Sequence, residues 1–190
     1  MTAAARAKRP RADFERNRSE ILAQAERHFA AEGVGASLET VARDAGVGSA
    51  TLYRHFPTRD ALLAEVLERR ATQIDVEITR IEAMSDSGAA LEAWLVAMED
   101  FFGAYEGLPG PLRNAFLEEH NPLATTCVGF VKSTDRLLRA AQQDGHARPG
   151  VRGRDLFLAA LAISWLRGAS MADRQSRQHL RSLLRDGYSV

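Results

Sequence analysis

Apolar residues recur along this chain at steps of three and four, the spacing that places them on one face of an α-helix. The first such pattern predicts a helix over 16–32, which Gly33 and Gly35 end. A longer pattern starts after Thr58, a natural helix cap, and runs to the polar break at 85–88. No segment alternates apolar and polar residues as a strand would. We therefore expect an all-α fold of about nine helices.

The segment 37–58, SLETVARDAGVGSATLYRHFPT, predicts two short helices joined by a tight turn. Ser37 is a suitable N-cap, because its hydroxyl oxygen can accept a hydrogen bond from an amide of the first turn. Gly46 suits the left-handed turn residue, where a Cβ would cost energy. Val41 and Leu52 are apolar at positions that hold the helices together. This combination predicts a helix-turn-helix motif over about 37–56, with 49–56 as the helix that reads DNA.

The predicted reading helix begins with small residues at 48–50, which let its backbone approach base edges. Thr51 offers a hydroxyl and a methyl group to a base, whereas Tyr53 and His55 can donate to phosphate oxygens. Arg54 can meet either. The complete set of candidate DNA contacts is Ser37, Thr40, Gly48, Ser49, Ala50, Thr51, Tyr53, Arg54, His55, Thr58, Arg59, Arg9 and Arg11.

Residues 17–67 resemble the DNA-binding domain of the tetracycline-repressor (TetR) family of transcriptional regulators, most specifically in TLYRHF at 51–56. The resemblance implies that Tyr53 and His55 bind phosphates, that 49–51 face bases, and that a C-terminal domain binds a small molecule. Many members carry a basic residue just before Thr51, and its absence here shifts base readout towards Thr51, Arg54 and the N-terminal arm.

The expected organisation has three parts: a disordered basic arm over 1–15, a helix-turn-helix domain over 16–67, and a helical effector-binding and dimerisation domain over 68–190. The formal net charge is zero, but in the first nineteen residues six basic side chains stand against two acidic ones. A basic arm on an acidic body concentrates the attraction for DNA at one end. The alternative is a solubilising tail without a defined contact.

The predicted C-terminal domain is rich in large apolar side chains, which either line an effector pocket or form an ordinary core. The candidate pocket residues are Trp94, Met98, Phe101, Phe102, Tyr105, Phe116, Cys127, Phe130 and Trp165. No cluster of like charges faces this stripe, so we expect a small, mainly apolar effector. A regulator without an effector, constitutive or tuned by a protein partner, is the other interpretation.

A single reading helix contacts only a few base pairs, so we expect a homodimer on a palindromic double-stranded operator. The last two predicted helices, about 153–167 and 171–187, can form a four-helix bundle across the two-fold axis. The candidate interface residues are Leu156, Ala160, Ile163, Leu180, Leu183 and Leu184. Alternatively, these side chains close the core of the monomer.

Several classes of protein are disfavoured. Cys127 is the single cysteine, which precludes an intramolecular disulfide and fits a reducing cytosol. No apolar run is long enough to span a membrane, and the N-terminus does not resemble a secretory signal. The five histidines are scattered, and no nucleophile elbow or phosphate-binding loop occurs. We therefore expect no metal, cofactor or enzymatic activity, but a cytoplasmic, nucleoid-associated repressor.

Overall fold

The computed structural model describes residues 3–115, 118, 120–166 and 173–190, with 3–11 and 174 described by their backbone alone. These residues form nine helices and no strand; an isolated antiparallel bridge pairs Ala147 with Ser189. The helices are α1 (Ala3–Glu32), α2 (Leu38–Asp44), α3 (Ser49–His55), α4 (Arg59–Glu82), α5 (Ser87–Phe102), α6 (Pro109–Ala115), α7 (Ala124–Gln143), α8 (Gly153–Trp165) and α9 (Arg174–Tyr188). The predicted all-α class is confirmed.

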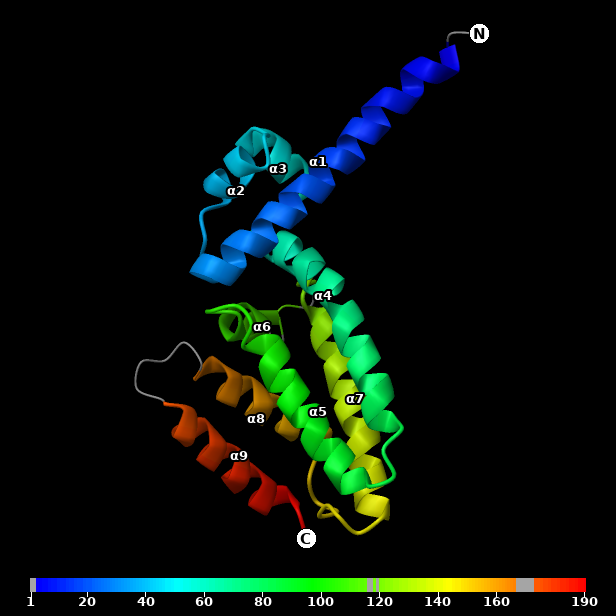
Figure 1. Ribbon diagram of the computed structural model, residues 1–190, viewed down its shortest axis with the longest axis vertical. Helices are drawn as coiled ribbons and strands as arrows, with labels where there is room; N and C mark the ends of the chain where they lie inside the picture. The colour runs from blue at the N-terminus through cyan, green and yellow to red at the C-terminus, as the bar shows by residue number, and fades with distance from the viewer. Residues whose placement is uncertain (1–2, 116–117, 119, 167–172) are drawn as a thin grey trace.

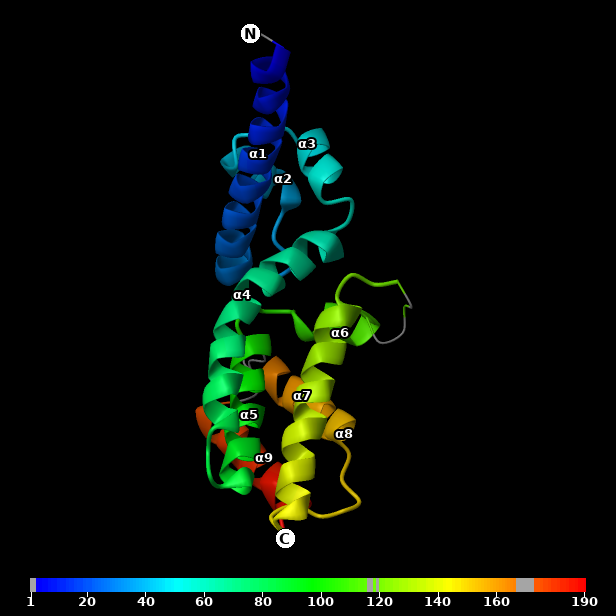
Figure 2. The same ribbon diagram turned by 90° about the vertical axis from the view of Figure 1, so that its right-hand side faces the viewer.

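Two groups of helices lie at opposite ends of the molecule, with α4 running from one into the other (Figure 1). We call α1–α3 with the start of α4 the head, and α5–α9 with the end of α4 the body. Seen from the side in Figure 2, α4 and α7 lie next to each other on one face of the body. In Figure 1, α9 lies on the opposite side, beyond α5 and α8.

The head has the predicted motif. Ser37 Oγ accepts a hydrogen bond from Thr40 N at 3.3 Å and caps α2. Gly46 has φ +69°, the left-handed turn conformation that a Cβ would strain. Val41 and Leu52 are fully buried between the two helices.

Helix α1 begins at Ala3, whereas the sequence prediction started the helix at 16 and left 1–15 disordered. The added turns are rich in Ala and Arg, which rank among the strongest helix formers. Pro10 removes one backbone donor there, but no glycine interrupts the segment. Apolar periodicity is weak before Phe14, so a prediction that relied on it could not detect these turns.

Helix α4 connects the two parts of the molecule. Thr58 Oγ1 accepts from Ala61 N at 3.0 Å, as the predicted cap requires. The 24 residues of α4 span about 36 Å. Leu62, Leu63 and Val66 are buried near its start, and Ile81 is buried near its end. A rotation of this helix would therefore act on both cores.

The body has an aromatic core. The Phe102 ring of α5 lies 4.7 Å from the Phe130 ring of α7 and 5.6 Å from the Phe157 ring of α8, between centroids. Trp94 and Met98 are also buried. Large rings lose much water-accessible area on folding, so this cluster stabilises the contact of the three helices.

Two helix boundaries in the body differ from the predictions. Helix α6 begins at Pro109, although the sequence suggested that 107–111 interrupts the chain. Proline is well accommodated in the first turn of a helix, because its missing N–H would be unpaired there anyway. Helix α8 ends at Trp165 and α9 begins at Arg174, and the predicted limits at 167 and 171 lie outside the described residues.

Candidate functional site

Helix α3 has one anchored side and one exposed side. Leu52 is fully buried and Phe56, just after the helix, is 2% exposed. Tyr53 is 48% exposed, and Arg54 is also exposed. Because the buried side chains fix α3 against the head, the exposed ones are held in position to meet a partner. The small residues at 48–50 are exposed as well, as close approach to bases requires.

His55 lies at the end of α3 against α1. Its ring centroid is 4.1 Å from that of Phe14, a contact that the sequence analysis did not predict. Burial lowers the pKa of His55, and the nearby Arg18 and Arg54 cations lower it further. The imidazole is therefore mainly neutral at pH 7, and a neutral imidazole still donates one N–H. Nδ1 is buried and has no hydrogen-bond partner among the described residues.

Ser37 and Thr58 place two exposed hydroxyl groups beside the motif. Their oxygens accept from the backbone as helix caps, which leaves the hydroxyl hydrogen of each side chain able to donate. Thr40, in the first turn of α2, is half-buried. Ser37, Thr40 and Thr58 thus belong to the same head as α3, and their contact with DNA stays a prediction.

Arg59 has a different role from the predicted phosphate contact. Its Nη1 donates to the carbonyl oxygens of Val34 and Ala36, at 2.7 Å each. This side chain fastens the loop between α1 and α2 to the first turn of α4. We assign it to holding the head together, because its charge is committed to these carbonyls. The side chains of Arg9 and Arg11 lie outside the described residues.

Arg18 is a residue that the sequence analysis counted only among the six basic side chains of the first nineteen residues. Its Nη2 bonds to Glu65 Oε1 of α4, and its guanidinium lies 5.3 Å from the centroid of the Phe56 ring. It therefore links α1, the end of α3 and α4. One signal could have revealed it: Arg18 precedes Ile21 and Leu22 by three and four residues, which puts it at the edge of the buried face.

A groove of about 520 Å³ lies between α4 and α7, the helices that Figure 2 places next to each other. This volume lies in the range of small-molecule sites. Helix α4 supplies small, apolar and acidic side chains, α5 supplies Trp94, and α7 supplies Phe130 with hydroxyl-bearing residues. The lining residues are Ala61, Ala64, Glu65, Glu68, Ala71, Ile74, Asp75, Ile78, Trp94, Pro122, Thr125, Thr126, Gly129, Phe130 and Ser133.

Two of the predicted pocket residues, Trp94 and Phe130, line this groove. A second group of predicted pocket residues does not line this groove and is buried in the core: Met98, Phe101, Phe102, Tyr105 and Cys127. A helical stripe of rings marks a buried face, but it does not say where packing leaves space. Burial raises the pKa of Cys127 to about 11, so its thiol is protonated at neutral pH.

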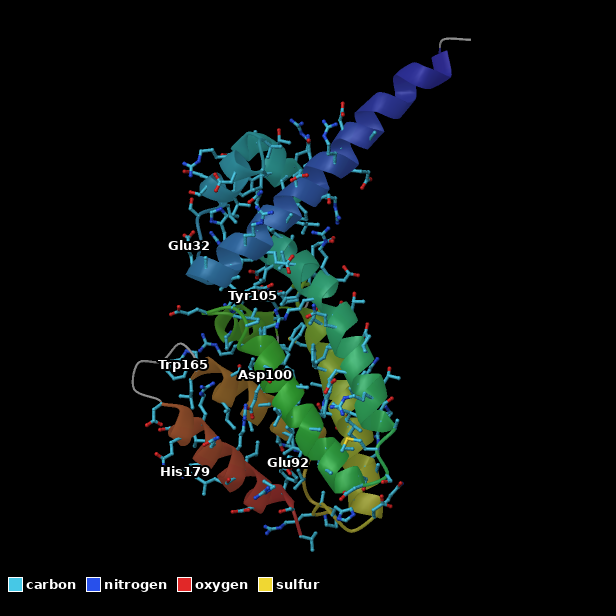
Figure 3. All side chains as sticks on the ribbon, in the orientation of Figure 1. Glu32, Glu92, Asp100, Tyr105, Trp165 and His179 are labelled. Carbon is cyan, nitrogen blue, oxygen red and sulfur yellow. The ribbon has the colours of Figure 1, made fainter. Side chains whose placement is uncertain are left out.

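Trp165 and Phe116 were the remaining predicted pocket residues. Trp165 is 54% exposed and lies on the far side of the body from α4 (Figure 3). It lines a separate hollow of about 410 Å³ between α6 and α8, with Leu158 and Arg113. Phe116 lies outside the described residues.

The predicted dimer residues divide into two groups. Leu156, Ala160 and Ile163 of α8 are buried within the monomer, which favours the alternative interpretation that they close its own core. On α9, Leu183 is 67% exposed, Leu180 is exposed and Leu184 is partly buried. Leu158 and Trp165 of α8, which line the hollow between α6 and α8, are also exposed, and the sequence analysis did not assign either of them to the dimer interface.

The described part of the chain offers neither a metal-ion site nor a membrane-spanning helix. No group of three or more His, Cys, Asp or Glu residues there could hold a metal ion. None of the helices there is long and apolar enough to cross a membrane.

Comparison with known proteins adds direct evidence. Residues 21–66 match the family model of bacterial regulatory proteins of the tetR family, and residues 86–190 match the C-terminal domain of SbtR-like transcriptional regulators. An HTH-type transcriptional regulator of Staphylococcus aureus (strain USA300), SAUSA300_2515, is 35% identical over 77 residues, which are 40% of each chain. This chain thus matches less than half the length of that curated relative.

Two solved structures are similar over nearly the whole chain. The TetR transcriptional regulator SCO0520 from Streptomyces coelicolor is 32% identical, with TM-score 0.59 over 90% of this chain and 98% of that chain. The TetR transcription regulatory protein from Mycobacterium vanbaalenii is also 32% identical, with TM-score 0.55 over 95% and 99% of the two chains. The predictions of a non-enzymatic, DNA-binding protein of this family are confirmed. The chain belongs to the TetR family of DNA-binding transcriptional regulators.

Proposed function

We propose that this regulator is a cytoplasmic homodimeric repressor, which leaves its operator when a small effector occupies the groove between α4 and α7. One observation carries the proposal: Glu65 lines the groove and also bonds to Arg18 of the head. The same carboxylate therefore belongs to the candidate effector site and to the contacts that hold the DNA-binding helices.

The proposed DNA contacts follow from exposure and chemistry. Tyr53, Arg54 and the neutral His55 donate to phosphates, and the Ser37 and Thr58 hydroxyls extend this contact along the backbone. Thr51 is half-buried at the start of α3 and reads a base through its methyl and hydroxyl groups. The basic arm, Arg9 and Arg11 included, adds a contact with an adjacent groove or phosphate backbone.

The proposed dimer joins the α8–α9 faces of two copies. Leu180 and Leu183 of α9 and Leu158 and Trp165 of α8 leave apolar surface exposed on the monomer. A partner that covers this surface stabilises the pair by removing it from water. Two heads then read two half-sites of a palindrome, and the paired protein obstructs polymerase at that site.

Effector release requires linkage between the groove and DNA. An effector that binds the DNA-incompetent arrangement more tightly, by about 1–3 kcal/mol, weakens operator binding by roughly 5- to 150-fold. Helix α4 is suited to this coupling, because it lines the groove and packs into the head core.

Genomic selection tests the DNA-binding part of the proposal. The full chain is incubated with sheared genomic DNA at low salt, and the bound fragments are sequenced and then titrated by fluorescence anisotropy. We expect enrichment of a palindromic site and a steep loss of affinity as salt rises, because each head displaces counterions from several phosphates. Enrichment of no sequence, or of a single non-palindromic half-site bound by a monomer, would contradict the proposal.

A further inference from the structure

The charge of the groove between α4 and α7 differs from the sequence expectation. Three carboxylates of α4 line it, those of Glu65, Glu68 and Asp75, and none of its lining residues is Lys, Arg or His. Three carboxylates with a single cation, Arg18, paired to one of them give a cleft a negative potential and concentrate ligands of opposite charge. A mainly apolar, uncharged effector would leave the carboxylates of Glu68 and Asp75 without a counterion, whereas Glu65 already has Arg18.

The three carboxylates differ in their partners. Glu65 is bonded to Arg18 of α1. Glu68 and Asp75 are exposed, and neither side chain has a hydrogen bond or ion pair with another described side chain. Two acidic groups of the groove are thus available to a ligand, and the third is shared with the head.

The floor of the groove supplies aromatic surface. The Trp94 and Phe130 rings stack at 5.6 Å between centroids and 20° between planes. Trp94 Nε1 already donates to Thr134 Oγ1 at 2.9 Å, so the indole offers the groove ring surface and no hydrogen-bond donor. Aromatic faces attract cations as well as apolar groups. Ile74 and Ile78 add an aliphatic wall on α4.

We propose that the effector of this groove is an organic cation with an apolar portion, of the alkyl- or arylammonium class. This inference rests on the proposed function, in which the groove is the effector site. The cationic group meets Glu68 and Asp75, and the apolar portion covers the rings of Trp94 and Phe130. Anions are excluded by repulsion, and uncharged ligands lose the ionic contact.

Glu65 links cation binding in the groove to the head, because its carboxylate is also bonded to Arg18 of α1. A cation that reaches Glu65 competes with Arg18 for the same carboxylate. Arg18 also lies 5.3 Å from the centroid of the Phe56 ring, at the end of the reading helix. Loss of its partner frees the Arg18 guanidinium, and the link between α1, α3 and α4 weakens. Ligand binding is thereby coupled to the position of α3.

Isothermal titration calorimetry on the full chain tests the ligand class with three probes of one skeleton. These are 4-phenylbutyl(trimethyl)ammonium, the uncharged N,N-dimethyl-4-phenylbutanamide and 4-phenylbutanoate. We expect the ammonium probe to bind roughly 10-fold more tightly than the amide, the size of two weak, solvent-exposed ion pairs with Glu68 and Asp75. The carboxylate probe should bind most weakly.

Variants then show which groups give the preference. The double variant Glu68→Gln/Asp75→Asn should bind the ammonium and amide probes about equally. Glu20→Gln, which removes an exposed carboxylate of α1 outside the groove, should keep the wild-type preference. The inference is overturned if the amide or carboxylate probe binds as tightly as the ammonium, if no probe binds, or if the double variant keeps the preference.

Operator anisotropy with and without the ammonium probe tests the coupling. We expect the probe to weaken DNA binding several-fold in the wild type, and the ratio of the two affinities to fall to about one in Glu65→Gln. An unchanged ratio in that variant would overturn the exchange with Arg18. If the wild type binds its operator but shows no cation preference, the ligand class fails while DNA binding stands; if it binds no DNA, the proposed function itself fails.

Discussion

The head and the body of this protein bury similar kinds of side chain, but they use their surfaces differently. In the head, buried Leu52 and Phe56 fix a helix whose other side is polar and exposed. In the body, buried rings leave an acidic groove on the α4–α7 face and apolar leucines on the α8–α9 face. The head thus presents one polar surface, which suits DNA, whereas the body presents two different surfaces, for which we propose a ligand and a second copy.

The largest expected effect is a loss of stability from a substitution in the core of the body. Phe102→Ala removes a fully buried ring that packs against Phe101, Phe130 and Phe157, so unfolding free energy should fall by about 3–5 kcal/mol. Urea denaturation followed by circular dichroism measures this. Val128→Ala, at an exposed position of α7, should change stability by less than about 0.5 kcal/mol. Equal losses in both variants would contradict the assignment of this core.

The second test separates the two faces of the body. Leu183→Glu puts a charge into the proposed α8–α9 interface, so the dimer dissociation constant should rise at least roughly 10-fold. Sedimentation velocity across a concentration series measures it. Val76→Glu adds the same charge at an exposed position of α4 and should leave the association unchanged. If Leu183→Glu remains fully dimeric, the interface lies elsewhere.

The third test compares two neighbouring groups on the reading helix. Arg54→Ala should weaken binding about equally for all DNA sequences and reduce the salt slope by about one, because a phosphate contact is lost. Thr51→Ala should change base preference, by about 1–3 kcal/mol at one position. Anisotropy with the selected operator and its single-base variants distinguishes them. A Thr51→Ala protein with unchanged affinity and preference would show that α3 is docked wrongly.

The smallest expected effect lies in the head and depends on pH. His28 Nδ1 lies 2.9 Å from Glu32 Oε1, and Nε2 lies 2.9 Å from Asp44 Oδ2, which joins α1 to α2. The hydrogen bonds to Glu32 and then Asp44 raise the pKa of His28 above 6.5. The stability that His28 contributes is therefore fully present below about pH 6.5, its pKa in the unfolded chain. This contribution is lost as the pH rises through the higher pKa of His28 in the folded protein.

Melting temperatures of the wild type and His28→Gln measure this effect. The difference between them should be larger at pH 6 than at pH 8.5, because only the imidazolium donates to both carboxylates. Arg80→Gln, which removes an exposed pair with Glu77 on α4, serves as a comparison whose effect should be the same at both pH values. A His28→Gln difference that grows towards pH 8.5 would contradict the assigned direction.

The head could be predicted closely because its determinants are local. The Ser37 and Thr58 caps each bond an amide three residues away, and the strain at Gly46 belongs to a single residue. Arg59 escaped prediction because its acceptors, the carbonyls of Val34 and Ala36, lie more than twenty residues earlier in the chain. Sequence spacing carries little information about such a contact.

The body could be predicted in class but not in detail. The apolar stripe of α5 correctly indicated a buried face, but which rings border the groove depends on how α4 and α7 pack. Small residues such as Ala64 and Gly129 lie beside this space and carry no distinctive pattern. The sequence could not identify Glu68 and Asp75 as residues of the groove, because an acidic residue on a helix usually marks a solvated face.

The most direct test of the central claim, that α3 enters the major groove, is cleavage of DNA from a position on this helix. Ser49→Cys carries an iron chelate, while native Cys127 stays unlabelled because it is buried and its pKa is raised to about 11. We predict strand cuts confined to two major-groove segments, one in each half of the selected operator. Random cuts, or cuts matched by a chelate at Ser189 near the end of α9, would contradict the account.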